Sequence, residues 1–505
     1  MRTLSSLFAA TLLAALGPTT SLALQFTHGV ASGEVTPFSV VLWTRTDGAA
    51  VLKVEVERIS PGPGPKKLTL AAAATATSDF TARVLVLPLL PDAAYRYKFR
   101  SGSATSEVGT FRTAPLPHVA RSVRFAYSGD SDGTKVGGVP FFNQFESLDA
   151  ARDEAPDFFV YHGDVIYSDS GLRPAGPATT LQEYRDAYKV NRELPALRNL
   201  LAATSSYVTW DDHEVQNDYD GQTVDPARYA AGRRAFHEFL PALDLLLPPD
   251  ASCAGRPRFR VFPWGSEADV ILIDERSCRS ADAAAACSLP VVGPDLAPTL
   301  PGPFRTFFGL PASPPLGCLA AINDPARTML GPVQKELLKL VLKHSPARFK
   351  FVLGGLPIQQ YWALPYDRWE GYGAERAELL NFIRDEGIEN VVFLATDNHA
   401  NYTNEVSIDT FSDPQPIARE FVTGPIATNT LEVEILNFGG PAALAGFNAL
   451  FDLAGVDCRN LDEYSYALVE VDATAGTAEV AFKDASGAPV LDSLTGLPCG
   501  GTVGP

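Results

Sequence analysis

Acidic residues follow four short apolar runs of this sequence, and two of the chain's seven histidines stand beside them. The runs end in Asp130, Asp164, Asp211-Asp212-His213-Glu214 and Asp397-Asn398-His399. In open α/β sheets, ligands bind beyond the carboxyl ends of the strands. We therefore expect these four segments to converge on one place.

Converging carboxylates repel one another and resist burial unless cations neutralise them. An oxygen-rich ligand set with few imidazoles suits Ca²⁺, Mn²⁺, Zn²⁺ or iron. Taken singly, an aspartate after a strand more often caps a helix or a turn, and a lone histidine is more often structural. The prediction of a metal site therefore depends on the whole set.

Two patterns describe the elements that would position these residues. From about residue 25 to 111, short β-rich runs alternate with turn residues, which indicates a small β-sandwich. Beyond a proline-rich linker, apolar runs alternate with amphipathic helices, which indicates an α/β fold. Expected strands are 123–128, 158–162, 207–210, 270–273, 349–353 and 391–395, and expected helices are 142–154, 181–201, 226–240, 332–343 and 374–385.

The chain begins with Met1-Arg2-Thr3, a short apolar run and Ser21-Leu22-Ala23, the pattern of a secretory signal peptide cleaved after Ala23. The run is too short to span a bilayer, and no later run is long and apolar enough. We expect a secreted, extracellular or periplasmic monomer without a membrane span. The predicted divisions are a signal peptide at 1–23, an N-terminal β-sandwich at 24–115 and a second domain at 116–500, with an insertion at about 252–323.

Six cysteines lie in the second half of the chain: Cys253, Cys278, Cys287, Cys318, Cys458 and Cys499. In a secreted chain they predict up to three disulfides among fifteen possible connectivities. Short spacings favour the pairs 278–287, 253–318 and 458–499. The alternative, thiolate metal ligands, lacks any CxxC pair. Asn401-Tyr402-Thr403 is a glycosylation sequon if the host glycosylates.

The balance of charge limits the partners. Lys and Arg number 41 and Asp and Glu 59, giving a net charge of −18. Nucleic-acid surfaces need basic patches, so we expect no such surface. A small anionic substrate stays compatible, because bound metals reverse the local field.

Several segments together resemble the alkaline phosphatase D (PhoD-like) family of calcineurin-like metallophosphoesterases. The matching segments are residues 26–33, 41–45, 162–167, 208–215, 272–276, and 328–331 with Gln334. The Trp-Asp-Asp-His-Glu block at 210–214 is the most specific, and the likeness runs from about residue 25 to 480. It implies an α/β/β/α sandwich of the metallophosphatase type with an N-terminal β-sandwich.

The resemblance also implies roles for individual residues. Asp164 would bridge two metals, with Gly163 letting the loop approach closely. Expected metal ligands are Asp130, Asp164, Tyr167, Asp212, Asn217, Asp397 and His399. Core packing for Tyr167 and a turn role for Asn217 stay open. His213 would assist the phosphoryl group or the leaving group, and Arg276 would hold phosphate or form a structural ion pair.

The sequence departs from the family at two places. Asp130 stands where the family often has a cysteine ligand to iron, and the run ending at Gly354-Gly355 lacks the histidine that two-metal phosphatases usually place there. The family implies Fe³⁺ and Ca²⁺. Because a carboxylate is harder than a thiolate, Zn²⁺ or Mn²⁺ become alternatives.

The implied activity is hydrolysis of a phosphate mono- or diester by a metal-activated hydroxide, with His213 assisting departure of the alcohol. The substrate would be a small molecule or a polymer. One alternative is a phospholipase D-like diesterase acting on lipids or cell-wall polymers. Another is a non-catalytic secreted binding protein that retains the fold.

Overall fold

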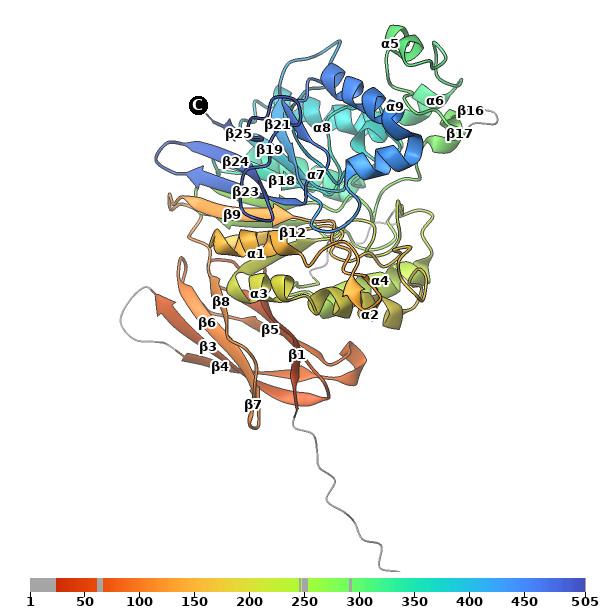
Figure 1. Cartoon of the computed structure of the whole chain (residues 1–505). Helices are drawn as coiled ribbons and strands as arrows, with labels where there is room; N and C mark the ends of the chain where they lie inside the picture. The colour runs from red at the N-terminus through yellow and green to blue at the C-terminus, as the bar shows by residue number, and fades with distance from the viewer. Residues whose placement is uncertain (1–23, 61–66, 245–246, 248–252, 290–292, 505) are drawn as a thin grey trace, which may run out of the picture.

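The computed structural model describes residues 24–60, 67–244, 247, 253–289 and 293–504 (Figure 1). The signal peptide predicted for residues 1–23 lies outside the described residues. Within the described ranges, no helix has the length and apolar character needed to cross a membrane.

Two large sheets form the centre of the molecule. In the described part of the chain, the larger has nine strands in the order β25 (Gly500–Val503), β24 (Thr477–Asp484), β23 (Ser465–Asp472), β9 (Val123–Ser128), β12 (Phe158–His162), β13 (Ser205–Thr209), β1 (Phe26–Gly33), β2 (Val40–Thr46) and β5 (Thr81–Val86). The other, counted over the same residues, has seven: β14 (Arg260–Trp264), β15 (Ala268–Leu272), β18 (Phe349–Leu353), β19 (Val391–Ala395), β21 (Ala418–Val422), β20 (Asn401–Val406) and β22 (Cys458–Asn460).

Helices cover the outer face of each sheet, as Figure 1 shows. Against the nine-stranded sheet pack α1 (Glu146–Asp153), α2 (Leu181–Arg192), α3 (Pro195–Ala203) and α4 (Pro226–Phe239). Against the seven-stranded sheet pack α7 (Pro332–His344) and α8 (Gly373–Asp385). The predicted α/β/β/α sandwich is therefore confirmed.

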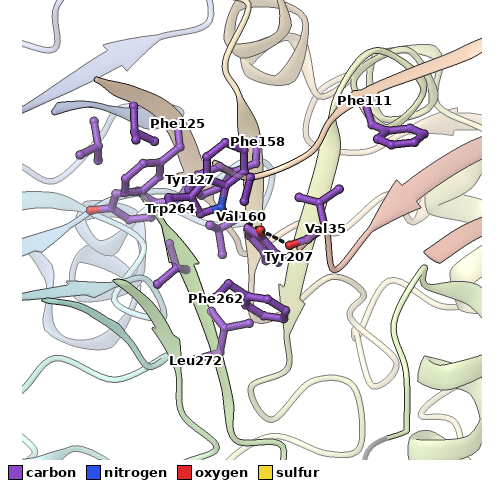
Figure 2. Packing of buried hydrophobic residues seen from close by; sticks show 14 of the residues in the cluster. Val35, Phe111, Phe125, Tyr127, Phe158, Val160, Tyr207, Phe262, Trp264 and Leu272 are labelled. Carbon is purple, nitrogen blue, oxygen red and sulfur yellow. Dashed lines mark hydrogen bonds between the residues drawn. The ribbon is translucent and has the colours of Figure 1, made fainter. Parts of the chain in front are cut away.

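Aromatic side chains fill the layer between the two sheets (Figure 2). Phe125 of β9 stacks on Phe158 of β12, with ring centroids 4.7 Å apart, and meets Phe351 of β18 edge-on at 5.2 Å. The indole Nε1 of Trp264 donates a 2.8 Å hydrogen bond to the hydroxyl of Tyr207. These contacts hold the sheets face to face and so fix where their strands end.

The N-terminal region is rich in β-structure, as predicted, but it is continuous with the larger sheet. A five-stranded sheet, counted in the described residues, contains β4 (Lys67–Ala74), β3 (Ala50–Ser60), β6 (Ala94–Ser101), β7 (Ala104–Thr105) and β8 (Gly109–Arg112). Strands β1, β2 and β5 instead extend the nine-stranded sheet, because β1 runs parallel to β13 with Ser32 opposite Ser205. The boundary at residue 115 stays a prediction.

Most predicted elements are present, and the main differences concern the helices. The expected helix 181–201 is two helices, because Pro195 cannot continue α2 and begins α3 instead. The expected helix 142–154 begins only at Glu146. A helix that the sequence did not predict, α9 (Leu431–Ala454), is kinked where Gly439 and Gly440 leave helical geometry.

Residues 252–323, predicted as an insertion, include β14 and β15 of the seven-stranded sheet, so that part belongs to the core fold. After β15 the range holds short elements: η2 (Ala284–Cys287), β16 (Ser288–Leu289), β17 (Gly293–Pro294), α5 (Gly302–Phe307) and α6 (Cys318–Ile322). The limits of the insertion stay a prediction. The sequon residue Asn401 is fully buried on β20. A glycan there would be incompatible with the folded chain.

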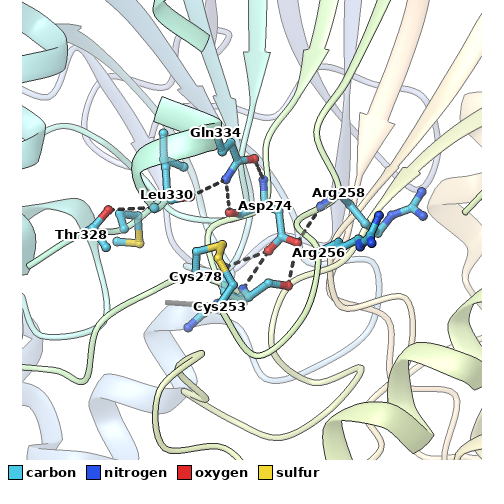
Figure 3. Close-up of a disulfide and its surroundings, with 12 residues drawn as sticks. Cys253, Arg256, Arg258, Asp274, Cys278, Thr328, Leu330 and Gln334 are labelled. Carbon is cyan, nitrogen blue, oxygen red and sulfur yellow. Dashed lines mark hydrogen bonds between the residues drawn. A yellow bond between two sulfur atoms is a disulfide. The ribbon is translucent and has the colours of Figure 1, made fainter. Parts of the chain in front are cut away.

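The six cysteines, all within the described residues, form the disulfides Cys253–Cys278, Cys287–Cys318 and Cys458–Cys499. The third pair is as predicted, and the first two predicted pairings were wrong. The amide of Ala254 donates to the carbonyl of Ser277 at 2.8 Å. This brings Cys253 beside Cys278 in the turn after β15 (Figure 3). Cys287 instead packs with Cys318 of α6 in a separate small core. Tertiary packing, rather than spacing along the chain, decides these pairs.

Candidate metal and catalytic site

The four acidic segments converge at the carboxyl ends of the central strands. Strands β9, β12 and β13 run parallel, so Asp130, Asp164 and the Asp211-Asp212 pair leave the same edge of the nine-stranded sheet. The facing sheet brings Asp397 after β19. Two hydrogen bonds join the sheets there: Thr396 Oγ1 donates to His162 O at 2.8 Å, and the amide of Asp397 donates to Asp130 Oδ1 at 3.2 Å.

The side chains at this junction form three groups that could each hold a cation. They are Asp130, Asp164 and His399; Asp164, Asp212 and His213; and Asp211, Asp212 and Asp397, with the ligand atoms of each group within 4.8 Å of one another. Asp164 and Asp212 each belong to two of the groups. A residue shared by two groups is placed to bridge two cations.

Three carboxylate oxygens show that these residues fit metal cations. Asp130 Oδ2, Asp211 Oδ2 and Asp212 Oδ1 are buried and lack a hydrogen-bond partner among the described residues. Burial raises the pKa of Asp130 to about 7 and raises the pKa of Asp164 well above its usual value, a shift that Asp212 increases. Buried unpartnered oxygens are costly unless a cation completes their coordination.

The backbone is strained at the same residues. Asp130, Asp164, Asp397 and His399 have φ values of 59°, 45°, 60° and 51°, in the left-handed region that few residues other than glycine occupy, although Asp and His enter it more readily than most. Such strain persists where the surrounding structure determines it, and it concentrates at functional sites.

Neighbouring contacts hold the Asp164 and Asp211 loops together. Gly163 has φ +71°, and a Cβ at that position would lie 2.9 Å from Asp211 Cβ, so the close approach predicted for Gly163 is present. Buried Glu214 accepts the amide of Val165 at 2.6 Å and that of Asp211 at 2.9 Å. The last residue of the Trp-Asp-Asp-His-Glu block thus fixes both loops.

His213 is held by a carboxylate on one side and an aromatic ring on the other. Its Nδ1 lies 2.5 Å from Asp169 Oδ1, and its ring stacks on Tyr167 at 4.1 Å between centroids. Its Nε2 lies 3.9 Å from Asp164 Oδ2. Burial would lower the pKa of His213, but Asp212 and Asp169 together raise it to about 10. The arrangement can therefore present a proton at Nε2 beside the metal groups.

Tyr167 and His399 are linked by a hydrogen bond at another side of the site. The hydroxyl of Tyr167 lies 2.8 Å from His399 Nε2, and His399 Nδ1 lies 3.1 Å from Glu434 Oε1 of α9. Both rings are buried. The structure thus brings Tyr167 to the metal groups rather than into a separate core, and its role as a ligand stays a prediction.

Arg276 is fully buried behind the carboxylates. Its guanidinium contacts Asp211, and it lies 2.7 Å from Asp367 and 3.3 Å from Asp397. These contacts match the structural ion pair that the sequence analysis left open. A phosphate-binding role for Arg276 stays a prediction.

Asn217 lies in the cavity but outside the three groups, and its side-chain amide donates to Asp218. Sequence reasoning missed Asp169, Asp367 and Glu434, and it gave Asp211 no ligand role. For Asp211, its position next to Asp212 in the same block was a signal in the sequence. Asp169, Asp367 and Glu434 had none.

All of these groups open into one cavity of about 960 Å³. Its described lining includes Asp164, Tyr167, Asp212, His213, Asp397 and His399. Pockets of this size accommodate small-molecule ligands. The predicted site residues therefore meet in one accessible place, apart from Arg276, which lies behind it, and Asp130, which is fully buried beneath it.

Comparison with known proteins agrees with this architecture. The sequence matches the family described as PhoD-like phosphatase over residues 134–478, and its N-terminal domain family over residues 13–115. Alkaline phosphatase D of Bacillus subtilis (strain 168) is 27% identical over 428 residues, a match covering 76% of this chain and 66% of that protein, just under two thirds of its length.

Solved structures share the fold. A structure of PhoD has a TM-score of 0.72 at 23% identity, covering 95% of this chain and 88% of that one. Purple acid phosphatase PPD1 from yellow lupin (Lupinus luteus) seeds has a TM-score of 0.54 at 11% identity, covering 93% and 73%. With the family match spanning most of the sequence, the chain belongs to the PhoD-like phosphatase family.

Proposed function

We propose that this chain is a secreted, metal-dependent phosphoesterase that prefers phosphodiesters. The observation that carries the proposal is the set of buried, unpartnered carboxylate oxygens gathered at one cavity beside His213. When bound, cations at such carboxylates lower the pKa of a coordinated water and neutralise charge on the phosphoryl group. The three disulfides are consistent with secretion.

The charge of the site suggests two cations. Asp130, Asp164, Asp211, Asp212 and Asp397 are brought together, and Arg276 pairs with three of them, Asp211, Asp212 and Asp397. The excess negative charge matches two di- or trivalent ions. The family implies iron and calcium, and Asp130 in place of a thiolate makes zinc or manganese alternatives.

His213 is proposed to give its Nε2 proton to the departing alcohol. Asp169 fixes the ring through Nδ1, so the other nitrogen faces the metal groups. The Tyr167 ring stacked on it limits rotation. A general acid needs this fixed orientation within reach of the leaving oxygen.

The preference for diesters follows from the lining of the cavity. Its described lining includes several acidic side chains and a single arginine, Arg368, whose guanidinium contacts the carbonyl of Ala363. A monoester carries one more negative charge than a diester near neutral pH, and acidic walls repel that extra charge.

The test compares p-nitrophenyl phosphate with its bis-ester, using purified protein reconstituted with calcium, iron, zinc or manganese. We expect turnover of both, a higher kcat/KM for the bis-ester, and loss of activity with chelator. His213→Ala should lose turnover while elemental analysis still finds metal. Inertness of the reconstituted protein toward both esters would refute the proposal, and bound metal without turnover would favour the non-catalytic binding protein.

A further inference from the structure

The cavity has a second, apolar half that phosphoryl chemistry does not use. Helix α9 contributes Ile435, Phe438, Phe447, Leu450 and Phe451 to its lining. Leu364 and two phenylalanines before α1, Phe141 and Phe142, also line it. Carboxylates and hydrocarbon side chains therefore face the same space.

The kink gives α9 two limbs with different attachments (Figure 1). The first limb is tied to the metal groups, because the amide of Leu431 donates to His399 O at 2.9 Å and Glu434 contacts His399 Nδ1. On the second limb, Phe451 packs edge-on against Tyr361 at 5.5 Å. The apolar wall is thus held in a fixed position relative to the metal groups.

Some of these apolar side chains are exposed to solvent, so packing in the hydrophobic core does not account for their position. Phe438 is 64% exposed at the end of the first limb, while Phe141 is 52% and Leu364 is 41% exposed. Exposed large apolar side chains that gather beside a polar cavity are typical of ligand-binding surfaces. A cavity of about 960 Å³ has space for more than a phosphoryl group.

We propose that the α9 wall binds one ester group of the substrate, and that this group is a hydrocarbon chain or ring. The inference rests on the proposed phosphodiesterase function and adds a substrate class to it. The phosphoryl group lies at the carboxylate half, and its hydrocarbon ester extends along Phe438, Phe447 and Phe451. These side chains determine specificity and take no part in bond breaking.

The test uses alkyl p-nitrophenyl phosphates from methyl to octyl below their micelle concentrations, so that the leaving group is constant and no lipid surface is present. Complete burial of one methylene would raise kcat/KM about fourfold. Because the wall is partly open, we expect a rise of about 10- to 100-fold from methyl to hexyl.

Two exposed positions on the same limb provide a matched pair of variants. Phe438 lines the cavity, whereas Leu436, 36% exposed, is not part of its described lining. Phe438→Ser should lower the hexyl-to-methyl ratio of kcat/KM at least about threefold, and Leu436→Ser should leave it unchanged. Both side chains are exposed, so neither change removes core packing.

A flat dependence on chain length, with turnover present, would overturn the inference and leave the phosphodiesterase proposal intact. A chain-length gain that both variants reduce equally, or that neither reduces, would also overturn it. If no ester is turned over, the proposed function fails by itself. Calorimetric binding of methyl and hexyl phosphate then still tests the wall, since affinity must rise with chain length and rise less in Phe438→Ser.

Discussion

Asp169 is the residue through which the proposed role of His213 can be tested without touching a metal group. Its Oδ1 lies 2.5 Å from His213 Nδ1, and its Oδ2 accepts the amide of Asn217 at 2.6 Å. The substitution Asp169→Asn keeps the shape of the side chain. An amide offers one acceptor oxygen where the carboxylate offers two, so it can satisfy only one of these donors.

The expected loss of kcat follows from the energy of the hydrogen bond between Asp169 and His213. A hydrogen bond to a charged group contributes about 1.5–3 kcal/mol, which corresponds to about 10- to 150-fold in rate if it orients His213 in the transition state. We therefore expect kcat for bis-p-nitrophenyl phosphate to fall by that factor, with KM changed by less than about threefold. Metal content should not change, because Asp169 belongs to none of the three metal groups.

The assay measures kcat, KM and metal content for the wild type, Asp169→Asn and Asp218→Asn. Asp218 lines the same cavity and interacts with Asn217, but no hydrogen bond or ion pair joins its side chain to His213 in the described structure. It therefore controls for the loss of a carboxylate alone. An unchanged kcat in Asp169→Asn, or equal losses in both variants, would refute the role given to the Asp169–His213 contact.

Three further changes test the strain at Gly163, one disulfide and one buried histidine. Gly163→Ala should cost about 1–3 kcal/mol of strain and lower kcat, because its Cβ would meet Asp211; thermal unfolding and turnover measure the two effects. Replacing Cys458 and Cys499 by alanine should lower the free energy of unfolding by about 2–4 kcal/mol relative to the oxidised wild type in denaturant titrations. Burial and the Arg45 guanidinium lower the pKa of His28 from 6.5 to about 4, so the unfolded state binds more protons and stability falls as pH decreases between these values. Asn tolerates the φ of 61° at this position, so His28→Asn is compatible with the fold. In urea titrations, the variant should lose about 2 kcal/mol less unfolding free energy than the wild type between pH 7 and pH 4, and an equal loss in both would contradict this.

The main candidate ligands could be predicted from sequence because the information is local. A short apolar run that ends in Gly-Asp, as at Asp164, specifies both a buried strand and an acid at its carboxyl end. Parallel pairing of these strands then places their carboxyl ends, and the acids that follow them, at the same edge of the sheet. The same reasoning predicted Asp130 and Asp397.

Residues positioned by tertiary contacts gave no comparable signal. Asp169 lies in a loop and Glu434 on α9, and only the folded chain brings them to His213 and His399. Helix α9 itself was missed because Gly439-Gly440-Pro441 interrupts the helical pattern, although the two limbs on either side are helical. Without α9, the apolar half of the cavity could not be inferred.

The geometry of the site depends on the pairing of the two sheets more than on any single motif. Asp130 leaves the nine-stranded sheet and Asp397 the seven-stranded sheet, each with a left-handed backbone and a carboxylate that resists burial. Isolated loops would relax from this arrangement, since both the strain and the charge repulsion oppose it. The Phe125–Phe351 contact joins the two sheets through β9, which leads to Asp130, and β18, which lies beside β19, the strand that leads to Asp397. Packing between the sheets thus supplies the free energy that keeps the carboxylates close enough to share cations.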